Sequence, residues 1–222
     1  MKDDSRMDKT EKTIQTYDRC ATAFEDKFMG LHLYRDSLHR FSGMIEKGWK
    51  VLDLGCGPGN VSRFLIDQIG NIDLTGIDLS REMIRLAERN VPEASFMVKD
   101  IRRLNFESAT YDAIVAAFCL PFLHDDEAEA LIRNMHRVLK PKGYLYLSCM
   151  EGTGEGFETA SFTAGEELFI NYFEETFLTD IFRDCGFCII DTIRQDYPET
   201  DGSVTTDMIF MLQKPTSEGV HP

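Results

Sequence analysis

The sequence lacks both a long hydrophobic run and an excess of positive charge. No stretch approaches the roughly 20 apolar residues that cross a bilayer, and the opening MKDDSRMDKTEKT contains no apolar run of the signal-peptide kind. We therefore expect a cytoplasmic protein without a membrane partner. Lys and Arg number 24 against 38 Asp and Glu, so the formal net charge is −14. Because a protein that grips a phosphate backbone needs clustered positive charge, nucleic acid is not an expected partner.

The six cysteines lack the dense spacing of a secreted disulfide scaffold. Most of them lie among apolar neighbours, as reduced core thiols do. The pair in CGFC (185–188) has no second pair to complete the four ligands typical of zinc, and it does not open a helix after a strand as in thioredoxin-like proteins. We therefore interpret the cysteines as structural and expect no metal.

Strand and helix patterns alternate along the centre of the chain. Strand-like segments occur at 49–54, 72–79, 94–100, 111–118 and 143–150. Helical patterns lie between them at about 60–69, 81–90 and 126–139. This alternation predicts parallel strands with helices on both faces. Two further strands, 187–197 and 203–214, flank the turn-rich PETDG and predict a closing antiparallel hairpin. The expected fold is α/β, a doubly wound, mostly parallel, seven-stranded sheet with a C-terminal antiparallel hairpin.

The length and composition predict one domain. Amphipathic helices are expected from Ile14 to about Phe28 and from Tyr34 to Ile45, and another from about Glu174 to Cys185. The segment after Met150 is rich in glycine, acids and aromatics, which favours an ordered but irregular lid. We expect six parts: disordered residues 1–12, an N-terminal helical cap 13–46, a ligand-binding core 47–150, a lid-like insertion 151–173, a closing helix and hairpin 174–214, and a tail 215–222.

The stretch VLDLGCGPGN (51–60) runs a strand into a glycine-rich turn, the place where open parallel sheets bind ligands. A dinucleotide fingerprint needs a glycine at position 60, where the chain has Asn60, and no phosphate loop ending in Gly-Lys-Ser/Thr occurs. Pro58 also removes one backbone N–H from the turn. The loop is therefore a poor cradle for a pyrophosphate.

Acidic residues end three successive predicted strands: Asp53, Asp78 and Asp100. A carboxylate in the position of Asp78 can accept both hydroxyls of a ribose, a role shared by NAD and adenosine cofactors. Asp100 can accept a hydrogen bond from an adenine amino group while Ile101 packs on the ring. Taken singly, Asp53 could equally cap the loop and Asp78 the following helix. The basic pair in IRRL (101–104) is interpreted as a solvated turn, so the three acids suit a cationic nucleoside.

Five elements in this order, VLDLGCGPGN, GIDLS, VKDI, YDAIVAAF and VLKPKGYLYLS, resemble the class I S-adenosylmethionine-dependent methyltransferases over about residues 12–214. The resemblance implies their Rossmann-like fold and S-adenosyl-L-methionine as cofactor. It also implies that the methionine end is held by Asp53 and the loop of Gly55, Cys56 and Gly57. By the same resemblance Asp78 binds the ribose, Leu79 flanks the adenine, and Asp100 and Ile101 bind it. The remaining implied cofactor contacts are Ala117, Phe118 and Tyr17, the last in YDRCATAF, where Phe24 replaces a common tyrosine.

His124 and Tyr172 are the candidates for catalytic roles. His124 follows the fourth strand, where it could serve as a general base or as a feature of the helix start, and both interpretations stay open. Tyr172 is expected in the wall of the lid. A sulfonium methyl group is already activated, so methyl transfer mainly requires an aligned nucleophile and the exclusion of water. Acids in the lid could attract a cationic acceptor or form a solvated rim.

The sequence after the fourth strand, FCLPFLHD, lacks the Asn/Asp-Pro-Pro-aromatic run common in methyltransferases that modify nucleic-acid amines or protein glutamine. Together with the acidic charge, this predicts in-line methyl transfer to a small-molecule acceptor by a monomer or homodimer. Three alternatives remain: a protein acceptor, a non-catalytic module that senses S-adenosylmethionine, and a nicotinamide dehydrogenase. Asn60 and Pro58 count against the dehydrogenase.

Overall fold

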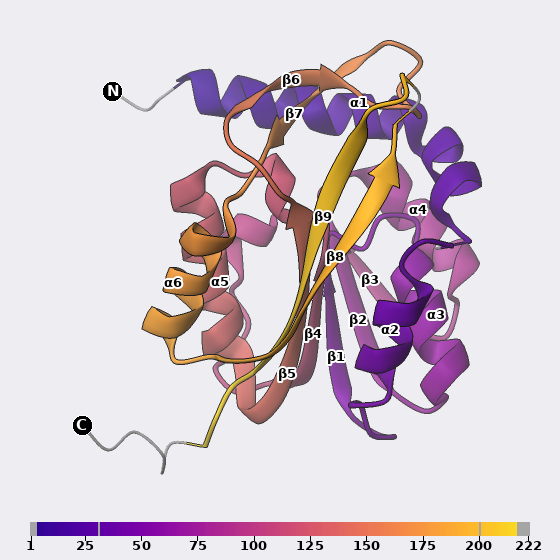
Figure 1. Cartoon of the computed structure of the whole chain (residues 1–222). Coiled ribbons are helices and arrows are strands. Elements are labelled where there is room, and N and C mark those ends of the chain that lie inside the picture. Colours follow the sequence, from indigo (N-terminus) through magenta and orange to yellow (C-terminus); the bar gives the residue numbers. More distant parts are fainter. Residues whose placement is uncertain (1–3, 31, 200, 217–222) are drawn as a thin grey trace.

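The computed structural model describes residues 4–30, 32–199 and 201–216. Its centre is a seven-stranded sheet in the order β3-β2-β1-β4-β5-β9-β8 (Figure 1). The strands are β1 (Lys50–Leu54), β2 (Asp73–Asp78), β3 (Ser95–Val98), β4 (Tyr111–Ala117), β5 (Leu139–Met150), β8 (Cys188–Pro198) and β9 (Val204–Gln213). Strands β3, β2, β1, β4 and β5 are parallel, whereas β9 runs antiparallel to both β5 and β8. The predicted fold class is confirmed.

Helices cover both faces of the sheet (Figure 1). One face carries α2 (Arg35–Ser42), α3 (Asn60–Ile69) and α4 (Arg81–Asn90). The other carries α5 (Asp125–Val138), α6 (Glu175–Cys185) and the short 3-10 turn η1 (Ile101–Arg103). The chain winds first to one side of β1 and then to the other side through β4, so the ligand crevice is expected at the carboxyl ends of these two strands.

Local chemistry sets several of these boundaries. The Ser80 hydroxyl accepts the Met83 N–H at 3.1 Å and caps the start of α4. Gly186 ends α6 with φ of 84°, as the sequence predicted, because a residue without Cβ adopts the left-handed conformation at little cost. The second helix is shorter than expected, ending at Ser42, and β5 begins four residues earlier than expected, at Leu139.

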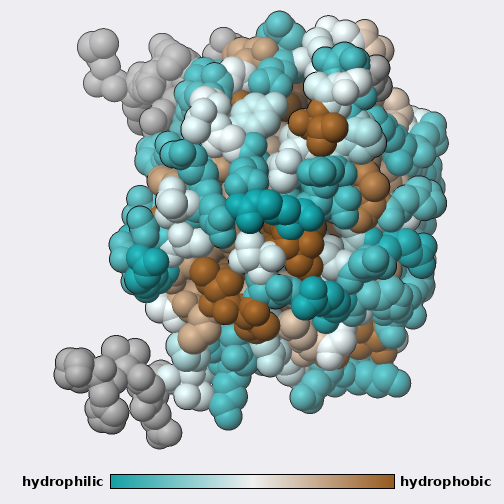
Figure 2. Space-filling model, in the orientation of Figure 1, coloured by the Kyte–Doolittle hydropathy of each residue, from teal (hydrophilic) through white to brown (hydrophobic). Residues whose placement is uncertain are grey.

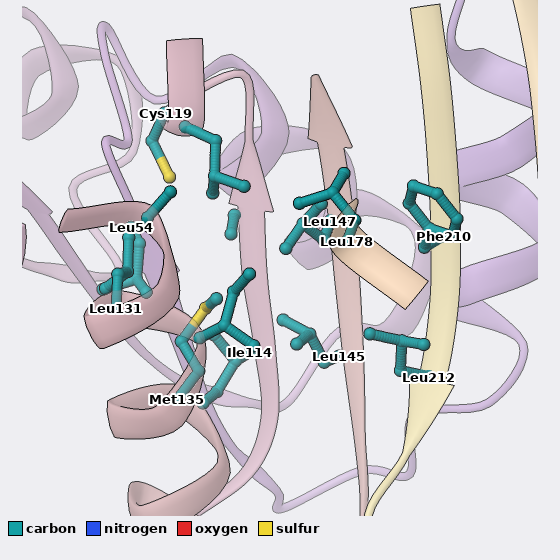
Figure 3. Packing of buried hydrophobic residues seen from close by; sticks show 14 of the residues in the cluster. Leu54, Ile114, Cys119, Leu131, Met135, Leu145, Leu147, Leu178, Phe210 and Leu212 are labelled. Atoms are coloured by element: carbon teal, nitrogen blue, oxygen red, sulfur yellow. The ribbon is translucent and has the colours of Figure 1, made fainter. Parts of the chain in front are cut away.

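The larger core lies between the sheet and the pair α5 and α6. Figure 3 shows leucine, isoleucine and phenylalanine side chains of the strands packed against side chains from those helices. The contributing residues include Leu54, Ile114, Leu145, Leu147, Phe210 and Leu212 from the sheet, and Leu131, Met135 and Leu178 from the helices. Every strand residue in this set is almost fully buried, which explains why central strands such as β4 have a nearly continuous apolar sequence.

Two elements differ from the sequence-based expectation at the amino end and in the lid. Helix α1 (Asp4–Phe28) begins at Asp4, so the prediction of disorder is wrong for residues 4–12, whereas residues 1–3 lie outside the described part. The insertion 151–173 is not irregular, because β6 (Glu155–Thr159) and β7 (Glu167–Asn171) pair as an antiparallel hairpin. The predicted tail is described only as far as residue 216.

Helix α1 and the β6–β7 hairpin lie together across the carboxyl ends of the parallel strands (Figure 1). The buried Thr13 hydroxyl accepts the Phe169 N–H at 3.0 Å and joins the two elements. On the hairpin side of α1, Arg19 and Lys12 form exposed ion pairs with Glu166 and Glu167. The hairpin is therefore an ordered roof, and α1 forms the other half of it.

Hydrophobic residues form small separate groups among hydrophilic ones on the face shown in Figure 2. Exposed large apolar side chains in the described part of the chain include Met97 and Val98 on the edge strand β3 and Ile189 and Ile190 on β8. Among the described residues, none of the helices has both the length and the hydrophobicity needed to cross a bilayer.

Candidate functional site

A cavity of about 720 Å³ lies between the carboxyl ends of the strands and the roof formed by α1 and the hairpin. It brings together every residue that the sequence analysis assigned to a cofactor. These are Tyr17, Asp53, Gly55, Cys56, Gly57, Asp78, Leu79, Asp100, Ile101, Ala117 and Phe118. The cavity also extends beyond these residues, toward the end of β5 and the start of β9.

The glycine loop after β1 can be built only with glycine at its first position. Gly55 has φ of 65°, and a Cβ there would lie 2.8 Å from the Cβ of Cys119. Gly57 has φ of 52°, and the nearest atom to a Cβ there is Cε1 of Phe24, at 3.6 Å. Both backbone conformations are disfavoured for residues with a side chain. The loop therefore presents bare backbone to the cavity.

Asp78 ends β2 and holds the glycine loop. Its Oδ2 accepts the Gly57 N–H at 3.0 Å, and its Oδ1 accepts the Ser80 N–H at 2.9 Å. Burial raises the pKa of this carboxyl, although the backbone hydrogen bonds oppose the shift. Since Ser80 provides the cap of α4, Asp78 has no capping role there and faces the cavity.

Asp53 is 1% exposed and accepts a hydrogen bond from the Ser62 hydroxyl at 2.6 Å. Burial raises the pKa of Asp53 to about 6. The hydrogen bond joins the end of β1 to α3, so the carboxylate supports the helix that follows the loop while it lines the cavity. A carboxylate that only capped the loop would not need this bond to Ser62 on α3.

Asp100 lines the cavity, but it is not free of positive charge as the sequence suggested. Arg102, which we had interpreted as solvated, is half-buried, lines the same cavity and pairs with Asp100 at 2.8 Å and with Glu127 at 3.2 Å. Although burial acts in the opposite direction, this guanidinium lowers the pKa of Asp100. The prediction for Arg102 is wrong because the turn η1 brings the Arg102 side chain back to the carboxylate of Asp100, the residue that caps the start of the turn.

Phe118 follows β4 in a left-handed backbone conformation, with φ of 54°. Such a conformation is an outlier for a bulky residue and needs support from its surroundings. The support comes from β5, because Ser148 accepts the Phe118 N–H at its hydroxyl, 3.2 Å away, and at its carbonyl, 3.1 Å away. The ring centroid of Phe118 lies 5.0 Å from that of Tyr34.

Tyr17 lies among aromatic side chains in the roof of the cavity. Its ring centroid is 5.3 to 5.7 Å from those of Phe24, Phe122 and Phe162. Burial and the Asp78 carboxylate raise the pKa of the Tyr17 hydroxyl, so it stays neutral at physiological pH. Phe24, which replaces a common tyrosine, contributes an apolar ring to this part of the wall.

A sequence profile of a methyltransferase domain matches residues 51–143, the segment that supplies most of the acids and the glycine loop. A methyltransferase structure from Methanosarcina mazei, described as S-adenosylmethionine-dependent, superposes with a TM-score of 0.69 at 25% identity, covering 79% of this chain and 96% of that one. Residues 51–143 thus match the methyltransferase-domain family, and these comparisons support the class I S-adenosylmethionine-dependent methyltransferase family that the sequence motifs resemble.

Two further relatives illustrate the range of proteins to which the chain is similar. Demethylmenaquinone methyltransferase of Thermotoga maritima is 37% identical over 98 residues, which are 44% of this chain and 42% of that one. The chain matches less than half of the length of each of the first curated relatives. A Burkholderia thailandensis N1-methyltransferase, solved with 1,6-didemethyltoxoflavin and S-adenosylhomocysteine, has a TM-score of 0.64 at 20% identity, covering 91% of this chain and 88% of that one.

The residues that line the cavity fit S-adenosylmethionine, the cofactor of this family. Acidic side chains at or just after the ends of β2 and β3 offer hydrogen-bond acceptors to a ribose and an adenine, and Gly55 and Gly57 of the glycine loop line the cavity. An adenine amino group bound at Asp100 would share this carboxylate with Arg102. All six cysteines are free, and the described part of the chain contains no cluster of three or more His, Cys, Asp or Glu residues that could hold a metal.

The two catalytic candidates lie in different surroundings. His124 is the N-cap of α5, and its Nδ1 lies 2.6 Å from Oε2 of Glu155, while Phe122 and Leu123 form the cavity wall beside it. The geometry therefore favours the helix-start interpretation of His124 over a general base. Tyr172 does line the cavity, and its hydroxyl donates to Oε2 of Glu158 at 2.9 Å. Burial, with help from that carboxylate, raises the pKa of Tyr172 to about 12.

Most acidic side chains of the lid form ion pairs, which agrees with their interpretation as a solvated rim. Glu151 pairs with Arg194, Glu155 with Lys9 and His124, and Glu166 and Glu167 with residues of α1. Glu158 is the exception, because it lines the cavity beside Tyr172.

Sequence analysis missed the residues that complete the far end of the cavity, namely Tyr34, Tyr146 and Asp207. They come from the segment before α2, from β5 and from β9, and no local motif connects them. One signal was present. Asp207 begins the otherwise apolar run DMIFML of a strand, where a charged residue requires an explanation.

Proposed function

We propose that this protein transfers the methyl group of S-adenosylmethionine to a small-molecule acceptor. The observation that carries the proposal is the continuous cavity that begins at Asp53, Asp78 and Asp100 and continues past Phe118 under the roof of α1 and the β6–β7 hairpin. One end suits a nucleoside with a cationic centre, and the other leaves room for a second molecule. A volume of about 720 Å³ is within the range of small-molecule sites.

In this proposal the cofactor is held by groups that the chain already orients. Asp78 accepts the ribose hydroxyls, Asp100 accepts the adenine amino group beside Ile101, and Asp53 with the glycine loop holds the methionine end. When bound, the cofactor supplies a methyl group that is already activated by a positively charged sulfur. The strained conformation of Phe118 fixes the wall at the junction between the two ends of the cavity.

The roof supplies what methyl transfer requires beyond an activated methyl group. Tyr17 from α1 and Phe162 from the loop between β6 and β7 meet in one aromatic cluster and cover the junction. Such a cover excludes water and holds an acceptor in line with the methyl group, which is the main source of rate acceleration in this kind of transfer. A macromolecular acceptor would have to pass under this roof, which favours a small molecule.

The decisive experiment has two steps. The purified protein is first titrated calorimetrically with S-adenosylmethionine, S-adenosylhomocysteine and NADH, and we expect micromolar binding of the two sulfur nucleosides only. It is then incubated with methyl-labelled S-adenosylmethionine and either the low-molecular-mass or the protein fraction of a cell extract. Label in a small product supports the proposal, and label in protein indicates a protein acceptor. Binding without any transfer would support a sensor, and NADH binding alone would overturn the cofactor assignment.

A further inference from the structure

The far end of the cavity is lined by acids, whereas Lys27 is outside the lining, with its Nζ 5.5 Å from the ring centroid of Tyr197. Glu158, Glu199, Asp201 and Asp207 all contribute to its wall. Among the described residues that line the cavity, the basic side chain is that of Arg102, which lies at the opposite end and pairs with Asp100 and Glu127. An acceptor with a carboxylate or phosphate group would therefore meet like charge without a compensating cation.

Asp207 is the most enclosed of these acids. It stands on β9 beside Met150 of β5 and is 2% exposed, yet it lines the cavity. The Tyr34 hydroxyl donates to its Oδ2 at 2.7 Å. Since the Tyr34 ring packs on Phe118, the contact from Asp207 through Tyr34 leads to the end of β4, where the cofactor and acceptor parts of the cavity meet.

Burying this carboxylate costs free energy that its surroundings do not fully return. Burial raises the pKa of Asp207 to about 6, although the Tyr34 hydroxyl opposes the shift. The Glu199 carboxylate acts in the same direction as burial, and Asp207 in turn raises the pKa of Tyr146 and Cys149, which burial raises most. A buried charge is normally paired or bound to a ligand. Tyr34 occupies Oδ2, which leaves Oδ1 for a donor on a bound molecule.

The walls next to Asp207 are aromatic. Tyr34, Tyr146 and Tyr197 line the same part of the cavity, and Phe118 closes it toward β4. Aromatic faces attract cations, and an enclosure of rings with one carboxylate at its edge is a recurrent way to bind a protonated nitrogen. The acidic lining and the aromatic walls thus favour the same class of ligand independently.

We propose that the methyl acceptor is a small amine and that Asp207 binds its nitrogen and determines this specificity. The inference rests on the proposed methyltransferase function. The bound ammonium group first loses one proton through the Asp207 carboxylate to solvent, and the lone pair of the resulting neutral amine then forms the new N–C bond. The C–S bond of S-adenosylmethionine breaks, and its electron pair stays on sulfur. The N–H proton released by the methylated nitrogen passes to the Asp207 carboxylate and then to solvent, so the products are the methylamine and S-adenosylhomocysteine.

The test measures binding and needs no turnover. Protein saturated with S-adenosylhomocysteine is titrated at pH 8 with 2-phenylethylamine and 3-phenylpropionate, two probes of similar shape and opposite charge, with 2-phenylethanol as the neutral reference. We expect the amine to bind at least about tenfold more tightly than the acid. Asp207→Asn should abolish this preference while it retains S-adenosylhomocysteine binding. Asp180→Asn removes the same charge from an exposed position on α6 and should leave the preference unchanged.

Each outcome decides something. Equal or tighter binding of 3-phenylpropionate, no measurable binding of 2-phenylethylamine, or an unchanged preference in Asp207→Asn overturns the assignment of an amine acceptor. A wild-type protein that does not bind S-adenosylhomocysteine overturns the proposed function instead. If Asp207→Asn does not fold, the wild-type preference is measured from pH 8 to pH 5. It should fall as Asp207 becomes protonated, and a preference that does not change over this range contradicts the proposal.

Discussion

The two ends of the cavity contain similar buried acids that are supported in different ways. Asp53 at the cofactor end and Asp207 at the acceptor end are both almost fully buried, and burial raises the pKa of each to about 6. The hydrogen-bond partner of Asp53 is Ser62, nine residues further along the chain. The partner of Asp207 is Tyr34, at a sequence separation of 173 residues. The same electrostatic problem is solved locally at one end and by long-range packing at the other.

This difference in sequence range also distinguishes the cofactor end, which family members can share as short motifs, from the acceptor end, which can vary between them. The cofactor end consists of consecutive strand ends and one glycine loop, so its chemistry is contained in short motifs between Asp53 and Phe118. The acceptor end is assembled from α1, the segment before α2, the β6–β7 hairpin and the β8–β9 hairpin. Substitutions in any of these elements can change the acceptor without disturbing the cofactor loop, which fits a fold that serves many substrates.

The largest expected effect tests whether the cofactor end works as a unit. Asp78→Ala removes the carboxylate at the end of β2 together with its hydrogen bonds to Gly57 and Ser80. Because charge-assisted hydrogen bonds to a ribose would be lost and the loop would lose its anchor, we expect S-adenosylhomocysteine affinity to fall by about 100-fold or more. Calorimetric titration measures the change. Asp180→Ala is the matched control, and unchanged binding by Asp78→Ala would remove Asp78 from the cofactor site.

The second prediction concerns the glycine loop. Gly55→Ala places a Cβ 2.8 Å from the Cβ of Cys119 at a backbone φ of 65°. Since the clash adds to the conformational strain, we expect the free energy of unfolding to fall by about 2–3 kcal/mol. Gly186→Ala is the control, because that residue also has positive φ but no atom within 4 Å of its Cβ position. Equal losses in urea denaturation of the two variants would mean that the close approach to Cys119 has no cost.

The third prediction compares how the stability of the wild type and of the Asp207→Asn variant depends on pH. The folded-state pKa of Asp207 is raised to about 6, above the usual value of about 3.9. The ionised form is therefore disfavoured by folding, and stability is lost as the pH rises through about 6. Relative to Asp207→Asn, the wild type should lose roughly 1–2 kcal/mol between pH 5 and pH 8. Urea denaturation of both proteins at each pH measures the difference, and a constant difference would contradict the raised pKa.

The smallest effect separates two kinds of contact in the roof. Thr13→Val removes the buried hydroxyl that accepts the Phe169 N–H and leaves that donor without its partner. We expect a loss of about 1 kcal/mol in the free energy of unfolding and greater protease sensitivity of the hairpin. Arg19→Ala breaks an exposed ion pair with Glu166 and should leave the urea midpoint unchanged. If Arg19→Ala loosens the hairpin more than Thr13→Val does, surface charge rather than the buried hydrogen bond holds the roof.

The sequence alone predicted those parts of the site whose interactions join residues close together in the chain. The period of the apolar residues predicted the sheet and the helix positions, and the strand ends predicted the shared location of Asp53, Asp78 and Asp100. Arg102 was misjudged because its ion pair with Asp100 depends on the turn η1, which composition does not reveal. His124 was ambiguous because a helix start and a cavity wall can adjoin the same strand end.

The sequence by itself determined the fold class and the glycine loop, because each depends on patterns within a few residues, while the resemblance to a known family supplied the full set of residues predicted at the cofactor end. Only the tertiary structure decided that α1 and the β6–β7 hairpin form one roof, and that Tyr34, Tyr146 and Asp207 meet beside Phe118. The physical reason is that these contacts join segments far apart in the sequence, such as Tyr34 and Phe118 at a separation of 84 residues and Tyr34 and Asp207 at a separation of 173. Their chemistry exists only after the core has packed.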